Sequence, residues 1–242
     1  PADRGCEPLA HGGGCRGEFA GRSGPGGERG GVSQNRSSAV MQQRSEPHDS
    51  LDDFPTPPWA TRALCEFLTQ GSPSMPLNMW TCREPAANRG HMVKPLREYF
   101  AAVDASDVHD YGAGFRVEDY LFGPPPQRVD WTITNPPFRL AEQFIERAAA
   151  TSRVGFAMIV RAAFLEGQGR YERLFSVNPP SYVLQFTERV VMHKGRLAPE
   201  GSTATAYAWL VWIDRERGTH LRWIKPCRKA LERAGDYGSA AA

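Results

Sequence analysis

The residues Asn135-Pro136-Pro137-Phe138 have the types needed to bind a planar molecule that carries an amino group. The two prolines fix φ and supply no N–H, so the loop is stiff and its carbonyl oxygens are free to accept hydrogen bonds. Asn135 adds a side-chain carbonyl, and Phe138 adds a flat face for stacking. An amine held by two acceptors keeps its lone pair directed at an electrophile. Positioning and electrostatic preorganisation could therefore drive a group transfer without a strong base.

The tripeptide alone is a weak signal, because Asn before Pro commonly begins a turn. A second copy, Asn178-Pro179-Pro180, is followed by Ser181 and not by an aromatic residue. We predict a plain loop without chemistry there. The first copy needs support from its neighbours.

That support comes from residues at the ends of three other predicted strand segments. The small residues of the loop 84–90 would let backbone amides approach a ligand. Asp107 stands at the next strand end, where a carboxylate can bind a ribose diol. Asp119 follows at the third strand segment and could accept a hydrogen bond from an adenine amine. Each has an ordinary alternative (a tight turn, a solvent-facing carboxylate, a helix cap), but the four features in this order favour one ligand site.

The elements that must position these residues alternate between strand-like and helix-like runs, as βαβ units do. Residues 203–213, rich in aromatic and small residues, predict a late antiparallel pair or hairpin arm. The predicted strands are 77–82, 101–106, a short segment around 119–122, 129–134, 155–160 and 182–186, and the predicted helices are 60–68, 91–100 and 140–150. Together, these elements predict a doubly wound, Rossmann-like α/β fold with a mostly parallel sheet. Ligands bind at the carboxyl ends of the strands in such folds.

Composition is that of an ordinary globular protein: 40% of the 242 residues are hydrophobic and 23% are charged. No run of about 18 apolar residues and no signal-peptide core occurs, so we expect a cytoplasmic protein. The five cysteines are odd in number and form no CxxC pair, which favours free thiols over disulfides or zinc. Residues 41–138 carry 8 basic and 13 acidic residues, whereas residues 139–242 carry 16 and 10. The basic half suits a polyanion, with chance clustering on a solvated surface as the alternative.

The first 40 residues differ in character from the rest. They hold 11 of the 24 glycines and almost no apolar periodicity, so they cannot bury enough apolar surface to offset their ordering entropy. We expect Met41 to be the natural start and residues 1–40 to be a disordered or non-native extension. A disordered tail that contacts nucleic acid is the alternative.

Taken together, these motifs resemble the amino-methyltransferase family, the S-adenosylmethionine-dependent enzymes that methylate adenine N6 or cytosine N4 in DNA. The resemblance spans roughly residues 55–224, and segments such as 107–112 and 207–212 resemble small phage- or prophage-borne members. NPPF is typical of adenine-N6 enzymes, and residues 54–59 are similar to the family's N-terminal cofactor motif. The resemblance implies cofactor-binding roles for Thr56, Pro57, Glu84, Pro85, Ala86, Asn88, Gly90, Asp107, Asp119 and Tyr120, and catalytic roles for Asn135, Pro136, Pro137 and Phe138.

Two departures from the family pattern affect the expected site. Asn88 stands where the family has the first glycine of its cofactor loop, and asparagine tolerates positive φ better than most residues. No separate target-recognition domain is visible, so residues 41–242 would form one methyltransferase domain. Recognition would then depend on the loop 189–203, with Lys194 and Arg196 as candidate nucleic-acid contacts. A plain solvated connection is the alternative for this loop.

The activity that the resemblance implies is methyl transfer from S-adenosylmethionine to N6 of adenine in duplex DNA, with the target base rotated out of the helix and without a metal. Cytosine N4, an RNA base and a protein glutamine amide also present planar amines and stay open as substrates. So does a non-catalytic nucleic-acid-binding module of the same fold. A nicotinamide-dependent dehydrogenase is less favoured, because the loop is not GxGxxG and no Tyr-x-x-x-Lys pattern occurs.

Overall fold

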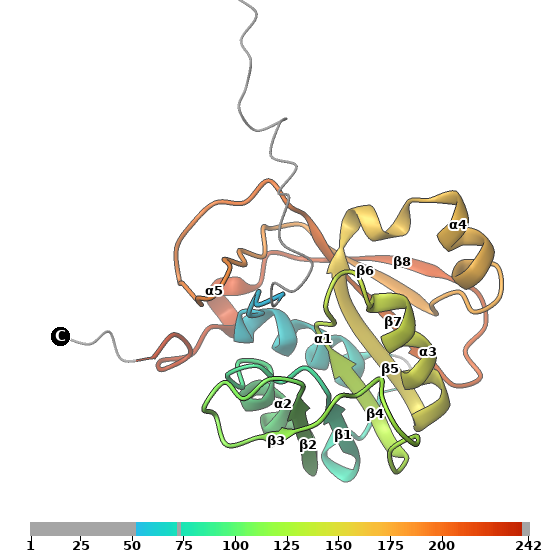
Figure 1. Cartoon of the computed structure of the whole chain (residues 1–242). Coiled ribbons are helices and arrows are strands. Elements are labelled where there is room, and N and C mark those ends of the chain that lie inside the picture. Colours follow the sequence, from blue (N-terminus) through green and yellow to red (C-terminus); the bar gives the residue numbers. More distant parts are fainter. Residues whose placement is uncertain (1–51, 72–73, 239–242) are drawn as a thin grey trace, which may run out of the picture. The chain divides into compact units, whose positions relative to one another are not determined.

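The computed structural model describes residues 52–71 and 74–238, and within them eight strands form one sheet in the order β3-β2-β1-β4-β5-β7-β6-β8 (Figure 1). The extension predicted over residues 1–40 lies outside the described residues. The strands are β1 (Thr81–Glu84), β2 (Ala102–Asp107), β3 (Arg116–Val117), β4 (Val129–Thr134), β5 (Ser152–Arg161), β6 (Tyr182–Phe186), β7 (Tyr207–Ile213) and β8 (His220–Ile224).

Strands β3, β2, β1, β4 and β5 are parallel neighbours, so their carboxyl ends meet at one edge of the sheet. The chain runs outward from β1 to β2 and β3 and then crosses to β4 and β5. The strand order therefore reverses between β1 and β4, which is where ligands bind in doubly wound folds. β7 is antiparallel to both β5 and β6, which confirms the predicted late antiparallel strand.

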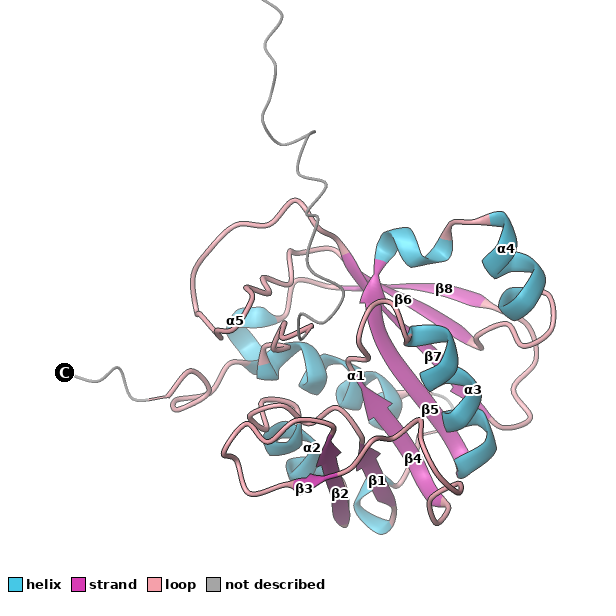
Figure 2. Ribbon diagram, in the orientation of Figure 1, coloured by secondary structure: helices cyan, strands magenta, loops and turns pink. Residues whose placement is uncertain are grey.

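Helices cover the two faces of the sheet (Figure 2). They are α1 (Pro58–Gln70), α2 (Val93–Tyr99), α3 (Ala141–Thr151), α4 (Gln168–Arg170) and α5 (Arg228–Leu231), with short 3₁₀ turns at Leu77–Met79 and Ala162–Leu165 and a π turn at Tyr171–Phe175. Successive residues of β5 alternate between the faces, as side chains in a strand must. Ile159 packs with Leu64 of α1 and Leu96 of α2, whereas Met158 packs with Ile145 of α3.

Several predicted elements needed correction. Residues 77–79 form a 3₁₀ turn, and β1 begins only at Thr81. The third strand, β3, lies just before Asp119 and does not include it. Neither the helical turns over 162–175 nor β8 was predicted. β8 pairs with β6 at the open edge and is mostly exposed, so its residues lack the buried apolar pattern by which strands are found.

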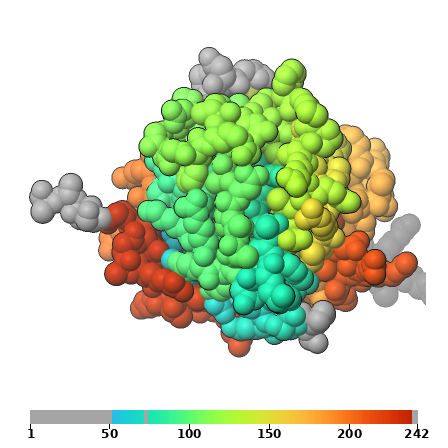
Figure 3. Space-filling model, turned by 90° about the horizontal axis from the view of Figure 1, so that it is seen from below, coloured from blue at the N-terminus to red at the C-terminus, as the bar shows by residue number. Residues whose placement is uncertain are grey.

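The connection from β2 to β4 has no helix among its described residues. It runs as an irregular segment interrupted only by β3, and in Figure 3 this green part of the chain forms much of the visible face. Its backbone is therefore free to shape one wall of the ligand site. The prolines and glycines between residues 112 and 126 are consistent with this course.

Candidate active site

A cavity of about 870 Å³, its open mouth included, lies at the strand-order reversal, beyond the carboxyl ends of β1, β2 and β4. Nine residues predicted from the sequence line it: Thr56, Pro85, Ala86, Asn88, Asp107, Asp119, Tyr120, Asn135 and Pro137. The structure thus brings together residues from five separate segments. The predicted residues Pro57, Glu84, Gly90, Pro136, Phe138, Lys194 and Arg196 are not among the lining.

The loop after β1 follows the conformation that the sequence predicts. Asn88 has φ of 50° and Gly90 has φ of 83°, so both occupy the left-handed region. A Cβ atom added at Gly90 would lie 2.9 Å from the Phe115 ring, which explains why a glycine stands there. The Asn88 backbone N–H donates to Asp107 Oδ2 over 2.8 Å and its side-chain amide donates to Asp53 over 2.7 Å. The asparagine therefore stabilises the left-handed turn of this loop.

Asp107 lies at the end of β2 with its carboxylate turned toward the cavity and the loop. Its Oδ1 accepts from the His109 N–H over 3.0 Å, and its Oδ2 accepts from Asn88. Burial raises the pKa of Asp107, and the two backbone donors oppose the rise. Each oxygen keeps a lone pair, so the carboxylate can still accept a hydrogen bond from a ligand hydroxyl.

Glu84 lies below the cavity and is fully buried. Its Oε1 accepts from the Ala86 N–H over 3.0 Å and from the Thr134 hydroxyl, so it links the loop after β1 to the end of β4. Its Oε2 has no hydrogen-bond partner among residues 52–71 and 74–238. Burial raises the pKa of Glu84 to about 8, although both hydrogen bonds oppose the rise. The carboxyl group is therefore protonated at neutral pH and holds two loops together without carrying a charge.

Asn135 presents a free acceptor at the wall of the cavity. Its Nδ2 donates to the backbone carbonyl of Phe54 over 2.8 Å. That bond fixes the orientation of the amide, because the nitrogen and not the oxygen must face the carbonyl. The Oδ1 atom is buried and has no partner in the described part of the chain. A buried, unpaired carbonyl oxygen is costly, and it calls for a donor from a ligand.

Phe138 lies outside the cavity and packs against two other side chains. Its ring centroid is 5.5 Å from that of Phe54, at an interplanar angle of 40°. The guanidinium carbon of Arg161 lies over the Phe138 ring, 3.8 Å from the centroid. The Phe138 ring therefore packs beside Phe54, which does line the cavity, and one of its faces is already covered by a cation.

Asp119 and Tyr120, which follow β3, lie in different environments. Asp119 is exposed, and its Oδ1 accepts from the Leu121 N–H over 2.9 Å, which leaves Oδ2 available. Tyr120 is buried against Phe144 and shares a hydrogen bond with Thr151. Asp119 can therefore meet a polar ligand group, whereas Tyr120 forms an apolar wall.

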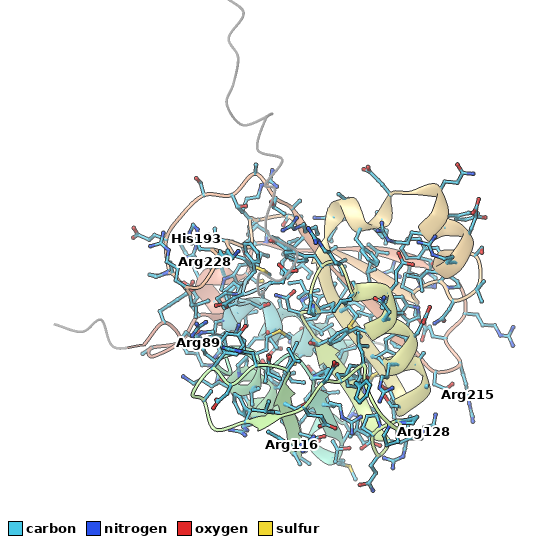
Figure 4. All side chains as sticks on the ribbon, in the orientation of Figure 1. Arg89, Arg116, Arg128, His193, Arg215 and Arg228 are labelled. Atoms are coloured by element: carbon cyan, nitrogen blue, oxygen red, sulfur yellow. The ribbon has the colours of Figure 1, made fainter. Side chains whose placement is uncertain are left out.

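The residues that the sequence interpretation missed lie mostly in residues 52–57, which we call the N-terminal strap. Asp52 accepts from the Phe138 N–H over 2.6 Å, and Asp53 binds both Asn88 and Arg89. The strap thus ties the loop after β1 to the loop after β4, and Figure 4 labels Arg89 at the first of these. The pair of aspartates before Phe54 was the available signal, but nothing in its spacing revealed the partners.

Two further cavity residues were also missed. His91 lines the cavity with a buried Nδ1 atom that has no partner, and burial lowers its pKa. Tyr111 lines it from the β2–β3 connection, with Arg89 4.9 Å from its ring centroid. Both residues are single polar or aromatic side chains in loops, a pattern too common to single them out.

The loop 189–203 lies beside the strap. Its backbone at Gly195 donates to the Asp53 carbonyl over 2.8 Å, and Met192 Sδ is 3.9 Å from Asn135 Nδ2. Lys194 and Arg196 are exposed at the turn that follows (Figure 4 labels the adjacent His193). The two cations thus follow a segment that contacts Asn135, and they do not line the cavity.

The described residues, 52–71 and 74–238, also bear on two other kinds of site. None of the helices they form is long and apolar enough to cross a membrane. Their His, Cys, Asp and Glu side chains form no group of three or more that could hold a metal ion.

Solved structures with a similar architecture include methyltransferases. A protein of Listeria monocytogenes, provisionally assigned as a class I S-adenosylmethionine-dependent methyltransferase, is 10% identical with a TM-score of 0.53, over 73% of this chain and 67% of that one. The methyltransferase subunit of a type I restriction-modification system from Streptococcus thermophilus is 9% identical with a TM-score of 0.52, over 78% and 51%. A Pyrococcus horikoshii protein provisionally assigned as an RNA methyltransferase is 16% identical with a TM-score of 0.50, over 70% and 91%.

No protein-family model and no curated protein matches the sequence. This chain spans about half the length (51%) of the restriction-modification subunit that it resembles. Identities this low bear on the fold alone. The chain has the Rossmann-like fold of S-adenosylmethionine-dependent methyltransferases, and the predicted fold class is confirmed.

Proposed function

We propose that this protein transfers a methyl group from S-adenosylmethionine to the N6 amine of adenine in DNA. The fold, the cavity at the strand-order reversal and the free acceptor on Asn135 support the proposal together. Of these, the unpaired Asn135 Oδ1 is the most important observation, because it is a buried acceptor that an amine N–H can satisfy.

The residues around the cavity fit S-adenosylmethionine as the cofactor. Asp107 would bind the ribose hydroxyls and Asp119 the adenine amine, while the strap residue Thr56 would contact the methionine end. The Oγ1 atom of Thr56 is buried without a partner, as Nδ1 of His91 is. Polar atoms left unpaired at a cavity wall are expected where a polar ligand binds. When bound, S-adenosylmethionine supplies a methyl group on a positively charged sulfur.

Residues 135–138, which we call the catalytic loop, would bind the target amine. Asn135 Oδ1 and the Pro136 carbonyl accept its two N–H donors, which holds the nitrogen lone pair toward the cavity. The strap keeps this acceptor rigid, because the Phe54 carbonyl accepts a hydrogen bond from Nδ2 of the same side-chain amide. Preorganised acceptors of this kind act without reorganisation in the transition state.

DNA as the substrate is supported by charge and by neighbouring structures. Loops that follow β5 and β6 open on the same edge as the cavity and present Arg161, Lys194 and Arg196 to solvent. Cations displace condensed counterions from phosphates. The Streptococcus thermophilus subunit named above belongs to a restriction-modification system, and the NPPF sequence favours adenine. The target base would be rotated out of the duplex to reach Asn135.

The test is transfer of labelled methyl from S-adenosylmethionine to unmethylated genomic DNA by the wild type and by Asn135→Ala. We expect the variant to lose at least about 100-fold in rate, as when one preorganised donor or acceptor is removed, and to keep its cofactor affinity. Asn178→Ala, in the second Asn-Pro-Pro copy, is the matched control and should retain full activity. An active Asn135→Ala enzyme would overturn the proposed role.

A further inference from the structure

Arg161 is a cation placed against the catalytic loop without a counter-charge. It is the last residue of β5, its side chain is exposed, and its guanidinium carbon is 3.8 Å from the Phe138 centroid and 5.9 Å from that of Phe54. No carboxylate of the described residues lies within ion-pair distance of it. Among the described residues, the printed contacts of its side chain are therefore with two aromatic rings, and no described carboxylate neutralises its charge.

By contrast, Arg89 and Arg62 are each neutralised by carboxylates. Arg89, next to Asn88, is paired with Asp53 at 2.9 Å, and the buried Arg62 of α1 is paired with Glu98 at 2.8 Å and with Asp236 at 2.7 Å. These pairs hold the protein's own elements together. Arg161 has no such internal role.

The position over Phe138 determines what Arg161 can bind. A guanidinium that lies on an aromatic ring keeps its N–H donors at its periphery, in its own plane. A planar fork of donors matches two oxygens of a phosphate. The ring meanwhile limits the rotamers of a long side chain, so less conformational entropy is lost when a ligand binds.

This arrangement also changes the expected role of Phe138. A base cannot stack on the face that Arg161 covers unless the arginine moves away. The Phe138 ring therefore positions the Arg161 guanidinium. Any contact of the ring with the base is made by the surface that Arg161 leaves uncovered.

We propose that Arg161 binds a backbone phosphate of the nucleic-acid substrate beside the target nucleotide, and so holds that nucleotide against Asn135. The inference rests on the proposed function in requiring a nucleic-acid substrate. It adds a substrate contact at the end of β5 that no sequence motif indicated.

The test measures how salt affects duplex DNA binding, by fluorescence anisotropy, together with the KM for DNA. In Arg161→Gln the slope of log K against log salt should become shallower by about 0.9, as for one lost phosphate contact, and the KM for DNA should rise about tenfold. Arg161→Lys should keep most of the slope, because the slope reports how many cations displace counterions and lysine keeps the charge. Affinity for S-adenosylmethionine should not change in either variant.

The matched control is Arg217→Gln. Arg217 is exposed in the β7–β8 turn, two residues after Arg215, which Figure 4 labels, and this turn lies at the edge of the sheet opposite to the end of β5. The variant should bind DNA with the wild-type slope. If Arg161→Gln shows the wild-type slope and KM while the wild type is active on DNA, the inference about Arg161 is overturned and the proposed function stands. DNA binding without methyl transfer by the wild type would overturn the proposed function and leave the slope to decide on Arg161. A wild type that does not bind DNA would overturn both.

Discussion

Glu84→Gln should make the free energy of unfolding less dependent on pH. The Glu84 carboxyl is fully buried below the cavity, and burial raises its pKa from 4.5 to about 8. Between these two values the folded protein keeps a proton that the unfolded chain has lost. The protonated carboxyl therefore contributes stability that is fully present below pH 4.5 and is lost as pH rises toward 8. Glutamine is a neutral group of the same shape, so the variant lacks this pH-dependent contribution to the free energy of unfolding.

The size of the effect follows from the width of that pH window. One proton bound to the folded state alone gives a slope of about 1.4 kcal/mol per pH unit. From pH 5.5 to 7.5 the wild type should therefore lose about 2–3 kcal/mol relative to Glu84→Gln. All other titrating groups are common to both proteins and cancel in the difference.

The assay is urea denaturation of both proteins at several pH values without ligand, followed by tryptophan fluorescence. Glu146→Gln, an exposed change on α3, controls for the loss of a carboxylate as such. A difference in unfolding free energy that stays constant between pH 5.5 and 7.5 would refute the reasoning, since it would mean that Glu84 is charged in the folded protein.

Two further predictions concern the loop after β1. Asp107→Ala should weaken S-adenosylmethionine binding about 10- to 100-fold in calorimetry, because a charge-assisted hydrogen bond is lost; unchanged affinity would remove Asp107 from the site. Asp53→Ala should lower the free energy of unfolding by about 1–3 kcal/mol, because Asn88 and Arg89 lose their shared acceptor. Thermal unfolding measures this change, and a melting temperature equal to that of the wild type would show that the strap does not stabilise the loop.

Much of the fold was predictable because its inner strands are strongly patterned. β4 occupies the predicted range, residues 129–134, since a short β-branched run that ends at a double proline leaves little freedom. α3 and β5 followed for similar reasons of periodicity and length. The placement of Asp107 and Asn135 at one cavity was predictable too, because parallel strands bring their carboxyl ends together.

The missed features depend on contacts between segments distant in sequence. Asp52 finds the Phe138 N–H across the fold, and no local pattern encodes that pairing. Phe138 itself was expected to offer an open face, whereas Arg161 covers one side of it. Such contacts are decided by tertiary packing, which periodicity and motif spacing do not describe.

The most direct test of the account is nucleoside analysis of DNA labelled by this protein with methyl from S-adenosylmethionine. We expect label in N6-methyladenine with the wild type, and no label when Asn135 is replaced by alanine. Label in N4-methylcytosine would keep the mechanism and contradict the base assignment. Measurable cofactor binding with no label in DNA would contradict the proposed substrate and direct the search to RNA and protein amides, and absence of cofactor binding would contradict the central claim itself.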